Sequence, residues 1–114
     1  MQLLTKEIHA KMYANHKATM AANGDDLGHK PVVKLFNPVG AGTWLLTEID
    51  EYGCCFGLCD LGMGFPELGY VMLSELETVK GPLGLGIERD VHWTADKTLA
   101  EYAEEARLHD RIIA

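Results

Sequence analysis

The sequence has 114 residues, of which 47% are hydrophobic and 24% are charged, and its formal net charge is −7. This length and composition predict one folded domain over residues 1–114 and argue against disorder. No apolar run approaches the roughly 20 residues of a membrane-spanning helix, and charged residues interrupt the start of the chain where a signal peptide would be apolar, so we expect a cytoplasmic protein and no membrane contact. Binding to nucleic acid is disfavoured because phosphates are neutralised by gathered Lys and Arg, which are few and scattered in this acidic protein.

A first helix is predicted close to the beginning of the chain. Thr5 is its expected N-cap, because a threonine hydroxyl accepts from the free N–H groups of the first turn. Leu4, Ile8 and Met12 recur at steps of four and form one narrow apolar stripe. Asn23-Gly24 is expected to end this helix.

Extended segments rich in β-branched and aromatic residues follow the first helix. The predicted strands are 32–36, 44–49, 54–60, 68–73 and 87–93. The links between these strands are short, which favours an antiparallel meander over parallel βαβ units. Residues 50–53 are predicted to form a tight turn. A short helix is predicted near residues 75–80, with Ser74 as its N-cap and Gly81-Pro82 as its stop.

A second amphipathic helix is predicted at the end, capped by Thr94 or Asp96. Its expected buried face consists of Leu99, Tyr102, Ala103, Ala106, His109 and Ile113. The pair Ile112-Ile113 either completes the core or is exposed for a partner, and the second alternative predicts a homodimer through the terminal helices. The predicted fold class is therefore α+β: a small antiparallel meander of about five strands with N- and C-terminal amphipathic helices and one short inserted helix.

Carboxylates give the best candidate for an enzyme site. Several that converge can do acid and base chemistry or hold a divalent cation. The catalytic candidates are Asp60, Glu67, Glu88 and Asp90, in a nuclease-like, metal-dependent enzyme. Against this stand the absence of an H-x-x-x-H motif and of a lysine suitably spaced after the acids. The alternative interpretation is structural: residues 88–90 close a turn by an ion pair and by backbone caps.

Three cysteines lie together as Cys54, Cys55 and Cys59, an odd number that does not suit a disulfide framework. On a strand, Cys54 points to one face while Cys55 and Cys59 point to the other. Cys55 and Cys59, with His92, are the candidate metal ligands. The competing interpretation is that free cysteines act as small buried hydrophobes. No cofactor is predicted.

Three classes of function follow from these observations. The first is a non-catalytic interaction module that docks on an unknown protein partner, with Glu67, Tyr70, Arg89 and Trp93 as binding residues. The second is the metal-dependent enzyme described above. The third is a nucleic-acid-binding accessory factor, in which sheet aromatics stack on bases and basic side chains meet phosphates. Those basic side chains would be Lys30, Lys34, Lys80 and Arg89.

Several blocks of sequence together carry a family resemblance. They are Leu3-Leu4-Thr5-Lys6-Glu7, Val33-Lys34-Leu35-Phe36-x-Pro38, Glu67-Leu68-Gly69-Tyr70, Leu73-Ser74-Glu75-Leu76-Glu77 and Ile87-Glu88-Arg89-Asp90. In register from residue 3 to about residue 93, the chain resembles the family catalogued as domain of unknown function 2958. The resemblance implies a small bacterial protein of the kind often carried by plasmids and other mobile elements, and it implies no activity. It is loosest over residues 12–20 and after Asp96.

Overall fold

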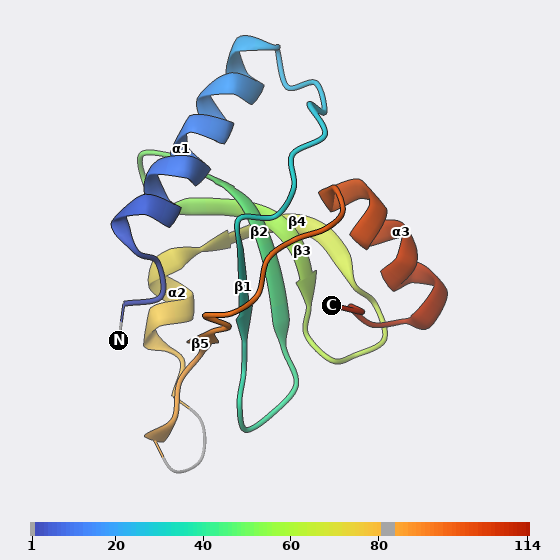
Figure 1. Cartoon of the computed structure of the whole chain (residues 1–114). Coiled ribbons are helices and arrows are strands. Elements are labelled where there is room, and N and C mark those ends of the chain that lie inside the picture. Colours follow the sequence, from blue (N-terminus) through green and yellow to red (C-terminus); the bar gives the residue numbers. More distant parts are fainter. Residues whose placement is uncertain (1, 81–83) are drawn as a thin grey trace.

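The computed structural model describes residues 2–80 and 84–114. The elements, in chain order, are α1 (Lys6–Ala21), β1 (Val33–Phe36), β2 (Thr43–Ile49), β3 (Cys54–Asp60), β4 (Glu67–Met72), α2 (Leu73–Thr78), β5 (Glu88–Arg89) and α3 (Leu99–His109). Over these residues, no helix has both the length and the apolar character that crossing a membrane requires. The expected α+β class is confirmed (Figure 1).

The strands form one antiparallel sheet in the order β4-β3-β2-β1-β5. β1 to β4 follow one another as the predicted meander. β5 differs: it returns to the far edge and pairs with β1 through Leu35 opposite Arg89 and Phe36 opposite Glu88. β5 is also much shorter than the expected strand 87–93. The strand order makes β4 and β5 the two edges of the sheet.

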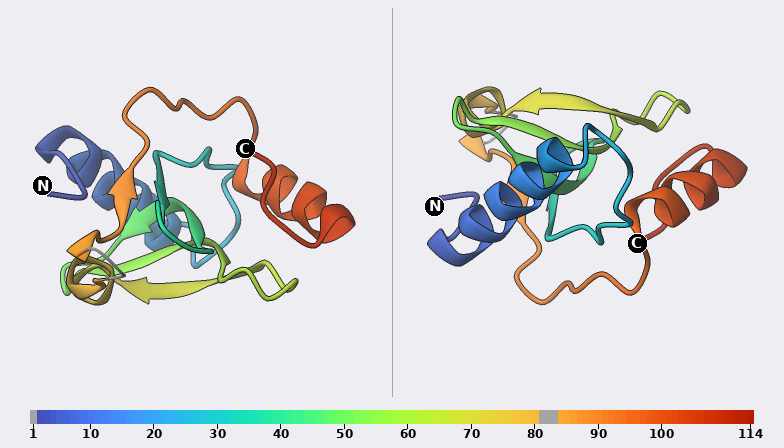
Figure 2. Two further views of the ribbon diagram at one scale, coloured as in Figure 1. Left: turned by 90° about the horizontal axis from the view of Figure 1, so that it is seen from below. Right: turned by 90° about the horizontal axis from the view of Figure 1, so that it is seen from above.

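The sheet separates two hydrophobic clusters. One cluster joins α1 and α2 to one face, with Met12 and Leu76 packed among strand residues such as Leu46. The other joins α3 to the opposite face, where Tyr102 and Ala106 pack on Leu58. Figures 1 and 2 show α1 and α3 on opposite sides of the sheet. Because Leu4 and Met12 are buried and Ile8 packs against them, the predicted stripe of α1 is confirmed.

The caps of the helices follow local chemistry, though not always at the expected residue. Thr5 caps α1 as predicted, since its Oγ1 accepts from the backbone N of Ile8 at 3.1 Å. The prediction for α2 was wrong: the helix begins at Leu73, so Ser74 lies inside it. Glu75 Oε1 accepts from the backbone N of Met72 at 3.4 Å and takes over the role of a cap. The predicted stop at residues 81–82 lies outside the described residues.

The cap of α3 is Thr98, so the expectation of Thr94 or Asp96 was wrong. Thr98 Oγ1 accepts from the backbone N of Glu101 at 3.2 Å, and Glu101 Oε1 accepts from the backbone N of Thr98 at 2.9 Å, which is a capping box. Asp96 instead accepts a 2.8 Å hydrogen bond from Tyr102 Oη. That bond, together with nearby Lys97, lowers the pKa of the Asp96 carboxyl.

The end of α3 also differs from the prediction. Asp110 adopts a left-handed conformation with φ 56°, so the helix ends at His109, which is exposed, and Ile113 lies beyond it. The chain then turns back, and Ile112 packs against the α3 cluster in the same molecule. Of the two alternatives for the terminal isoleucine pair, Ile112 therefore serves the domain's own core.

Candidate functional site

A β-bulge in β2 decides which side chains face the open part of the sheet. Leu46 lies opposite Gly57, but Glu48 lies opposite Phe56, so Thr47 is the extra residue. Thr47 is buried and its Oγ1 donates to the backbone O of Phe56 at 3.3 Å, while Asn15 Nδ2 donates to the backbone O of Thr47 at 3.0 Å. A bulge interrupts the alternation of side chains along a strand. Glu48 is thereby placed on the face of β3 that carries Phe56.

Glu48, Phe56 and Tyr70 form a row across three strands. Glu48 on β2 lies opposite Phe56 on β3, and Phe56 lies opposite Tyr70 on β4. Directly opposed side chains on one face contact each other, and the Phe56 and Tyr70 ring centroids are 5.0 Å apart at 54°. Tyr70 is 75% exposed. The row therefore runs from a half-buried carboxylate to an exposed aromatic ring.

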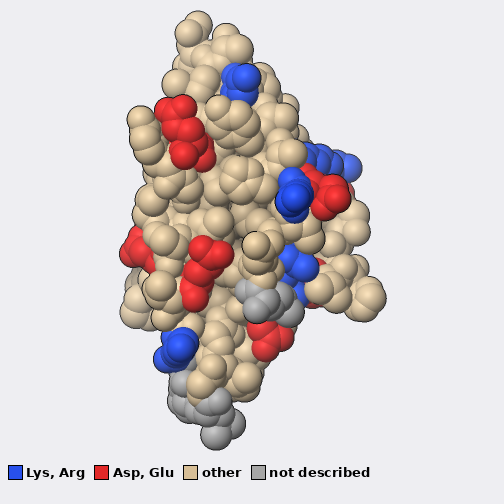
Figure 3. All heavy atoms as spheres, turned by 90° about the vertical axis from the view of Figure 1, so that its left-hand side faces the viewer, with Lys and Arg blue, Asp and Glu red and all other residues tan. Residues whose placement is uncertain are grey.

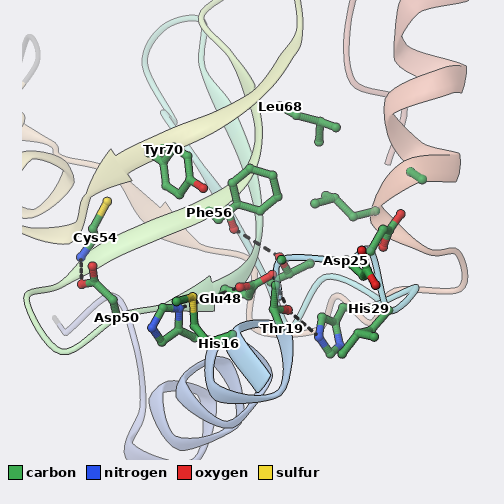
Figure 4. Close-up of a pocket in the computed structure, with 17 residues that line it drawn as sticks. His16, Thr19, Asp25, His29, Glu48, Asp50, Cys54, Phe56, Leu68 and Tyr70 are labelled. Carbon is green, nitrogen blue, oxygen red and sulfur yellow. Dashed lines mark hydrogen bonds and ion pairs between the residues drawn. The ribbon is translucent and has the colours of Figure 1, made fainter. Parts of the chain in front are cut away.

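A polar network links this row to the end of α1. Thr19 Oγ1 donates to Glu48 Oε2 at 3.2 Å and lies 3.3 Å from His29 Nε2, and His16 Nδ1 lies 3.9 Å from Glu48 Oε1 (Figure 4). A carboxylate only accepts, so the single hydroxyl hydrogen of Thr19 goes to Glu48. His29 Nε2 must then donate to Thr19, which means that His29 does not act as a base towards this hydroxyl.

These residues line a cavity of about 330 Å³, which we call the open-face pocket. It lies between the β3–β4 face, the end of α1, the segment 24–29 and the start of α3. Its apolar side chains are Met20, Leu27, Phe56, Leu68, Tyr70 and Leu99. Its acidic side chains are Asp25, Asp26, Glu48 and Asp50, and among the described residues no Lys or Arg lines it. Four carboxylates against two histidines make the pocket negative.

The four predicted catalytic carboxylates lie apart from this pocket. Glu67 is on β4 and Glu88 is on β5, the opposite edges of the sheet. Asp60 is buried, and its two oxygens accept from the backbone N of Gly62 at 2.8 Å and of Ile112 at 3.0 Å. Asp90 lies 3.8 Å from Lys34 Nζ. The fold therefore does not gather these acids, and it gives Asp60 a structural contact to the end of the chain.

The predicted binding residues are also divided. Tyr70 lines the open-face pocket and Glu67 is exposed on the same strand. Trp93 lines a second cavity of about 400 Å³, which shares His29 with the first, and packs 5.9 Å from the Tyr102 ring. Arg89 has a structural contact: its Nη1 donates to the backbone O of Leu3 at 2.7 Å and of Gln2 at 3.1 Å.

The cysteines lie as the strand period predicts. Cys55 and Cys59 pack in or against the α1 cluster, and Cys54 lines the open-face pocket on the other face. His92 is exposed beyond β5. Across residues 2–80 and 84–114, no three His, Cys, Asp or Glu side chains are close enough to hold a metal ion together.

Burial keeps the thiols protonated. Desolvation raises the pKa of Cys54 and of Cys59, with the Asp50 and Glu75 carboxylates raising that of Cys54 further. Desolvation first, and then neighbouring charges, raises the pKa of Cys55 to about 12. A neutral thiol is a poor metal ligand and a poor nucleophile. The environment of the three cysteines thus favours the interpretation that they act as small hydrophobic residues.

We expect Cys55 to resist alkylation by iodoacetamide at pH 8 in the folded protein. At a pKa of about 12 its thiolate fraction is roughly a thousandfold below that of a free cysteine, and its side chain is fully buried. Time-resolved labelling followed by peptide mass spectrometry measures the rate. The protein unfolded in guanidinium should label at all three cysteines, and folded Cys55 that labels at the unfolded rate would contradict the assignment.

Sequence reasoning missed most of the polar network. His16 and Thr19 are three residues apart and so share one face of α1, which could have been predicted from the sequence. The contribution of His29 and the placement of Glu48 could not have been predicted, because they depend on the path of the segment 24–29 and on the bulge.

Comparison with known proteins gives one match. No curated protein and no solved structure matches the chain significantly. The family model described as "Protein of unknown function (DUF2958)" matches residues 3–113. The match reaches beyond the expected limit near residue 93 and includes both terminal helices. The chain therefore belongs to the family described as protein of unknown function DUF2958.

Proposed function

We propose that this protein is a non-catalytic interaction module that docks on another protein through β4 and the loop before it. The observation that carries the proposal is the apolar exposure of this segment. Its exposed side chains are Leu61 (56%), Met63 (69%), Phe65 (78%), Leu68 (40%) and Tyr70 (75%), which we call the β4 surface. Large apolar side chains that gather on a surface mark sites of interaction.

The backbone of β4 supports the same surface. β4 is an edge of the sheet and pairs with β3. Natural edge strands are commonly protected by lysine, proline or a covering element, but within Glu67–Met72 the one charged residue is Glu67. Such an edge can receive an extended segment of a partner as a further strand.

The register of β4 shows which groups are free. Leu73 N donates to the backbone O of Gly53 at 2.9 Å, and hydrogen-bonded pairs alternate along an antiparallel ladder. The N–H and C=O groups of Gly69 and Val71 therefore point to β3, while those of Leu68 and Tyr70 point outward. Leu68 and Tyr70 thus offer both backbone hydrogen bonds and exposed side chains to a partner.

The other two classes receive less support from the geometry. The predicted catalytic acids do not converge, and His29 donates to the Thr19 hydroxyl instead of accepting its proton, which goes to Glu48. For nucleic acid, Lys34 and Arg89 are already engaged, with Asp90 and with backbone carbonyls. On the face seen in Figure 3, Lys and Arg are interspersed with Asp and Glu instead of forming one patch.

The bacterial, cytoplasmic and mobile-element setting that the resemblance implies is part of this proposal, as is the identity of the partner as a protein of that setting. A homodimer through the terminal helices stays a prediction.

We expect the variants Phe65→Ser and Tyr70→Ser to weaken capture of the partner from the host by roughly 30-fold each, because exposed aromatic anchors dominate docking energies. Affinity capture with quantitative mass spectrometry measures this. Leu108→Ser is the matched control, because Leu108 is 80% exposed but lies on α3. Equal capture by all variants, or a loss confined to the control, would contradict the proposal.

A further inference from the structure

The open-face pocket has a chemistry of its own beside the β4 surface. Two of its apolar side chains, Leu68 and Tyr70, belong to the β4 surface as well, so a partner docked there lies directly over the pocket. A side chain that the partner sends inward would pass the tilted Phe56 and Tyr70 rings and meet the Glu48 carboxylate, with Asp50 and Asp25 to either side (Figure 4).

The carboxylates are not all saturated by the protein. Asp50 Oδ1 accepts from the backbone N of Tyr52 and of Cys54, both at 2.9 Å, which leaves its other oxygen for a ligand. Asp26 Oδ1 accepts from the backbone N of Gly28 at 2.8 Å. Asp25 is exposed at the pocket. Glu48 is held in place by Thr19, and each carboxylate oxygen has more than one lone pair to offer.

This combination selects one kind of side chain. Aromatic faces attract a cation, while carboxylates accept its hydrogen bonds. A guanidinium group is planar, stacks on rings and donates in its own plane, whereas an ammonium is a compact, strongly hydrated charge. Within the part of the chain that the structure describes, no Lys or Arg lines the pocket to pair with these acids, and the basic side chain beside Glu48 is His16, at 3.9 Å.

We propose that the open-face pocket receives an arginine side chain of the protein partner, with its stem on Phe56 and Tyr70 and its guanidinium at the Glu48 carboxylate, while Asp50 and Asp25, on opposite sides of Glu48, add negative charge (Figure 4). This inference rests on the proposed docking function and adds the chemistry of the partner: an extended segment with one arginine that anchors it.

A displayed library of random peptides tests the proposal. The folded protein is expected to enrich peptides that share an arginine at one position of the consensus. In the best synthetic peptide, replacement of that arginine by citrulline, which keeps the shape and removes the charge, should weaken binding at least tenfold. Enrichment without a shared arginine, equal binding by the citrulline peptide, or no enrichment over the carrier background would overturn the proposal.

Variants of the protein test whether the arginine binds at the carboxylates of the open-face pocket. Glu48→Gln and Asp25→Asn should each weaken the arginine peptide several-fold and leave the citrulline peptide unchanged, with folding checked by thermal unfolding. Glu104→Gln is the control, because Glu104 is an exposed acid of α3 outside the pocket. Equal binding by Glu48→Gln, Asp25→Asn and the control would also overturn it. If capture of the native partner still depends on Tyr70 while arginine is not required, the inference fails and the docking function stands.

Discussion

Replacing Gly57 by alanine is expected to lower the free energy of unfolding by about 3 kcal/mol, at the upper end of the cost of overpacking a core. A Cβ at Gly57 would overlap the carbonyl oxygen of Leu45 and would lie 2.8 Å from Leu46 Cα. Both are backbone atoms of the central strand β2, just before the bulge, so they cannot move aside as a flexible side chain would. Chemical denaturation followed by circular dichroism measures the loss, and the melting temperature should fall by about 10–15 °C.

Gly69→Ala is the matched control, because Gly69 lies directly opposite Gly57 on β4. A Cβ there would meet no heavy atom within 4 Å. The substitution also restricts the unfolded chain, so we expect a change between zero and a gain of about 1 kcal/mol. If the two alanine variants lose the same stability, close contact with β2 is not the reason for the glycine at position 57.

Removing the carboxylate of Asp60 is expected to cost about 3 kcal/mol. Asp60→Ala leaves the backbone N–H groups of Gly62 and Ile112 without their acceptor. A donor orphaned away from water costs about 1–3 kcal/mol, and because Gly62 is exposed, most of the loss comes from the half-buried N–H of Ile112 and from the space left by the Asp60 side chain. Because Ile112 follows α3, amide exchange of residues 110–114 and of the last turn of α3 should accelerate more than that of β2. Hydrogen exchange with mass spectrometry resolves these segments.

Two further variants separate this contact from a general effect of lost charge. Asp60→Asn keeps one acceptor oxygen and should lose about half as much stability as Asp60→Ala. Asp90→Ala removes a partly exposed ion pair with Lys34 and should cost less than 1 kcal/mol. Unchanged exchange at residues 110–114 in Asp60→Ala would show that the contact does not hold the end of the chain.

Elements specified by neighbouring residues could be predicted from the sequence. The turn after β2 is an example: Asp50 Oδ1 accepts from the backbone N of Tyr52 and of Cys54, all within a few residues. The same holds for the cap of α1 at Thr5 and for its apolar stripe. The four-strand meander follows from such turns, because a tight connection brings consecutive strands side by side.

Features that depend on distant contacts could not be predicted. β5 pairs with β1 for two residues, and Arg89 reaches the carbonyls of Gln2 and Leu3 near the other end of the chain. The bulge leaves no local signal either, because Thr47 suits a regular strand as well as a bulged one.

The candidate site shows the same division. The position of Tyr70 on a short strand could be predicted from the sequence, and the residue lines the pocket, while its role in binding stays a prediction. Thr19, Glu48 and His29 come from three separate segments, and their hydrogen bonds exist because packing brings α1 across β2. The spacing of these three residues in the sequence does not indicate that they are in contact in the fold.

The extra residue in β2 makes the strand more tolerant of losing a residue than of gaining one. Before Thr47 the even-numbered side chains Trp44 and Leu46 face the α1 cluster, and after it Ile49 does. Deleting Thr47 would leave Leu46 opposite Gly57, Glu48 opposite Phe56 and Ile49 opposite Cys55 in a regular strand, so each of these side chains would keep its face. A single-residue insertion would need a second bulge, or it would turn the Glu48 carboxylate into hydrocarbon and Ile49 into water. Natural variation in this strand should therefore include deletions at the bulge more often than insertions.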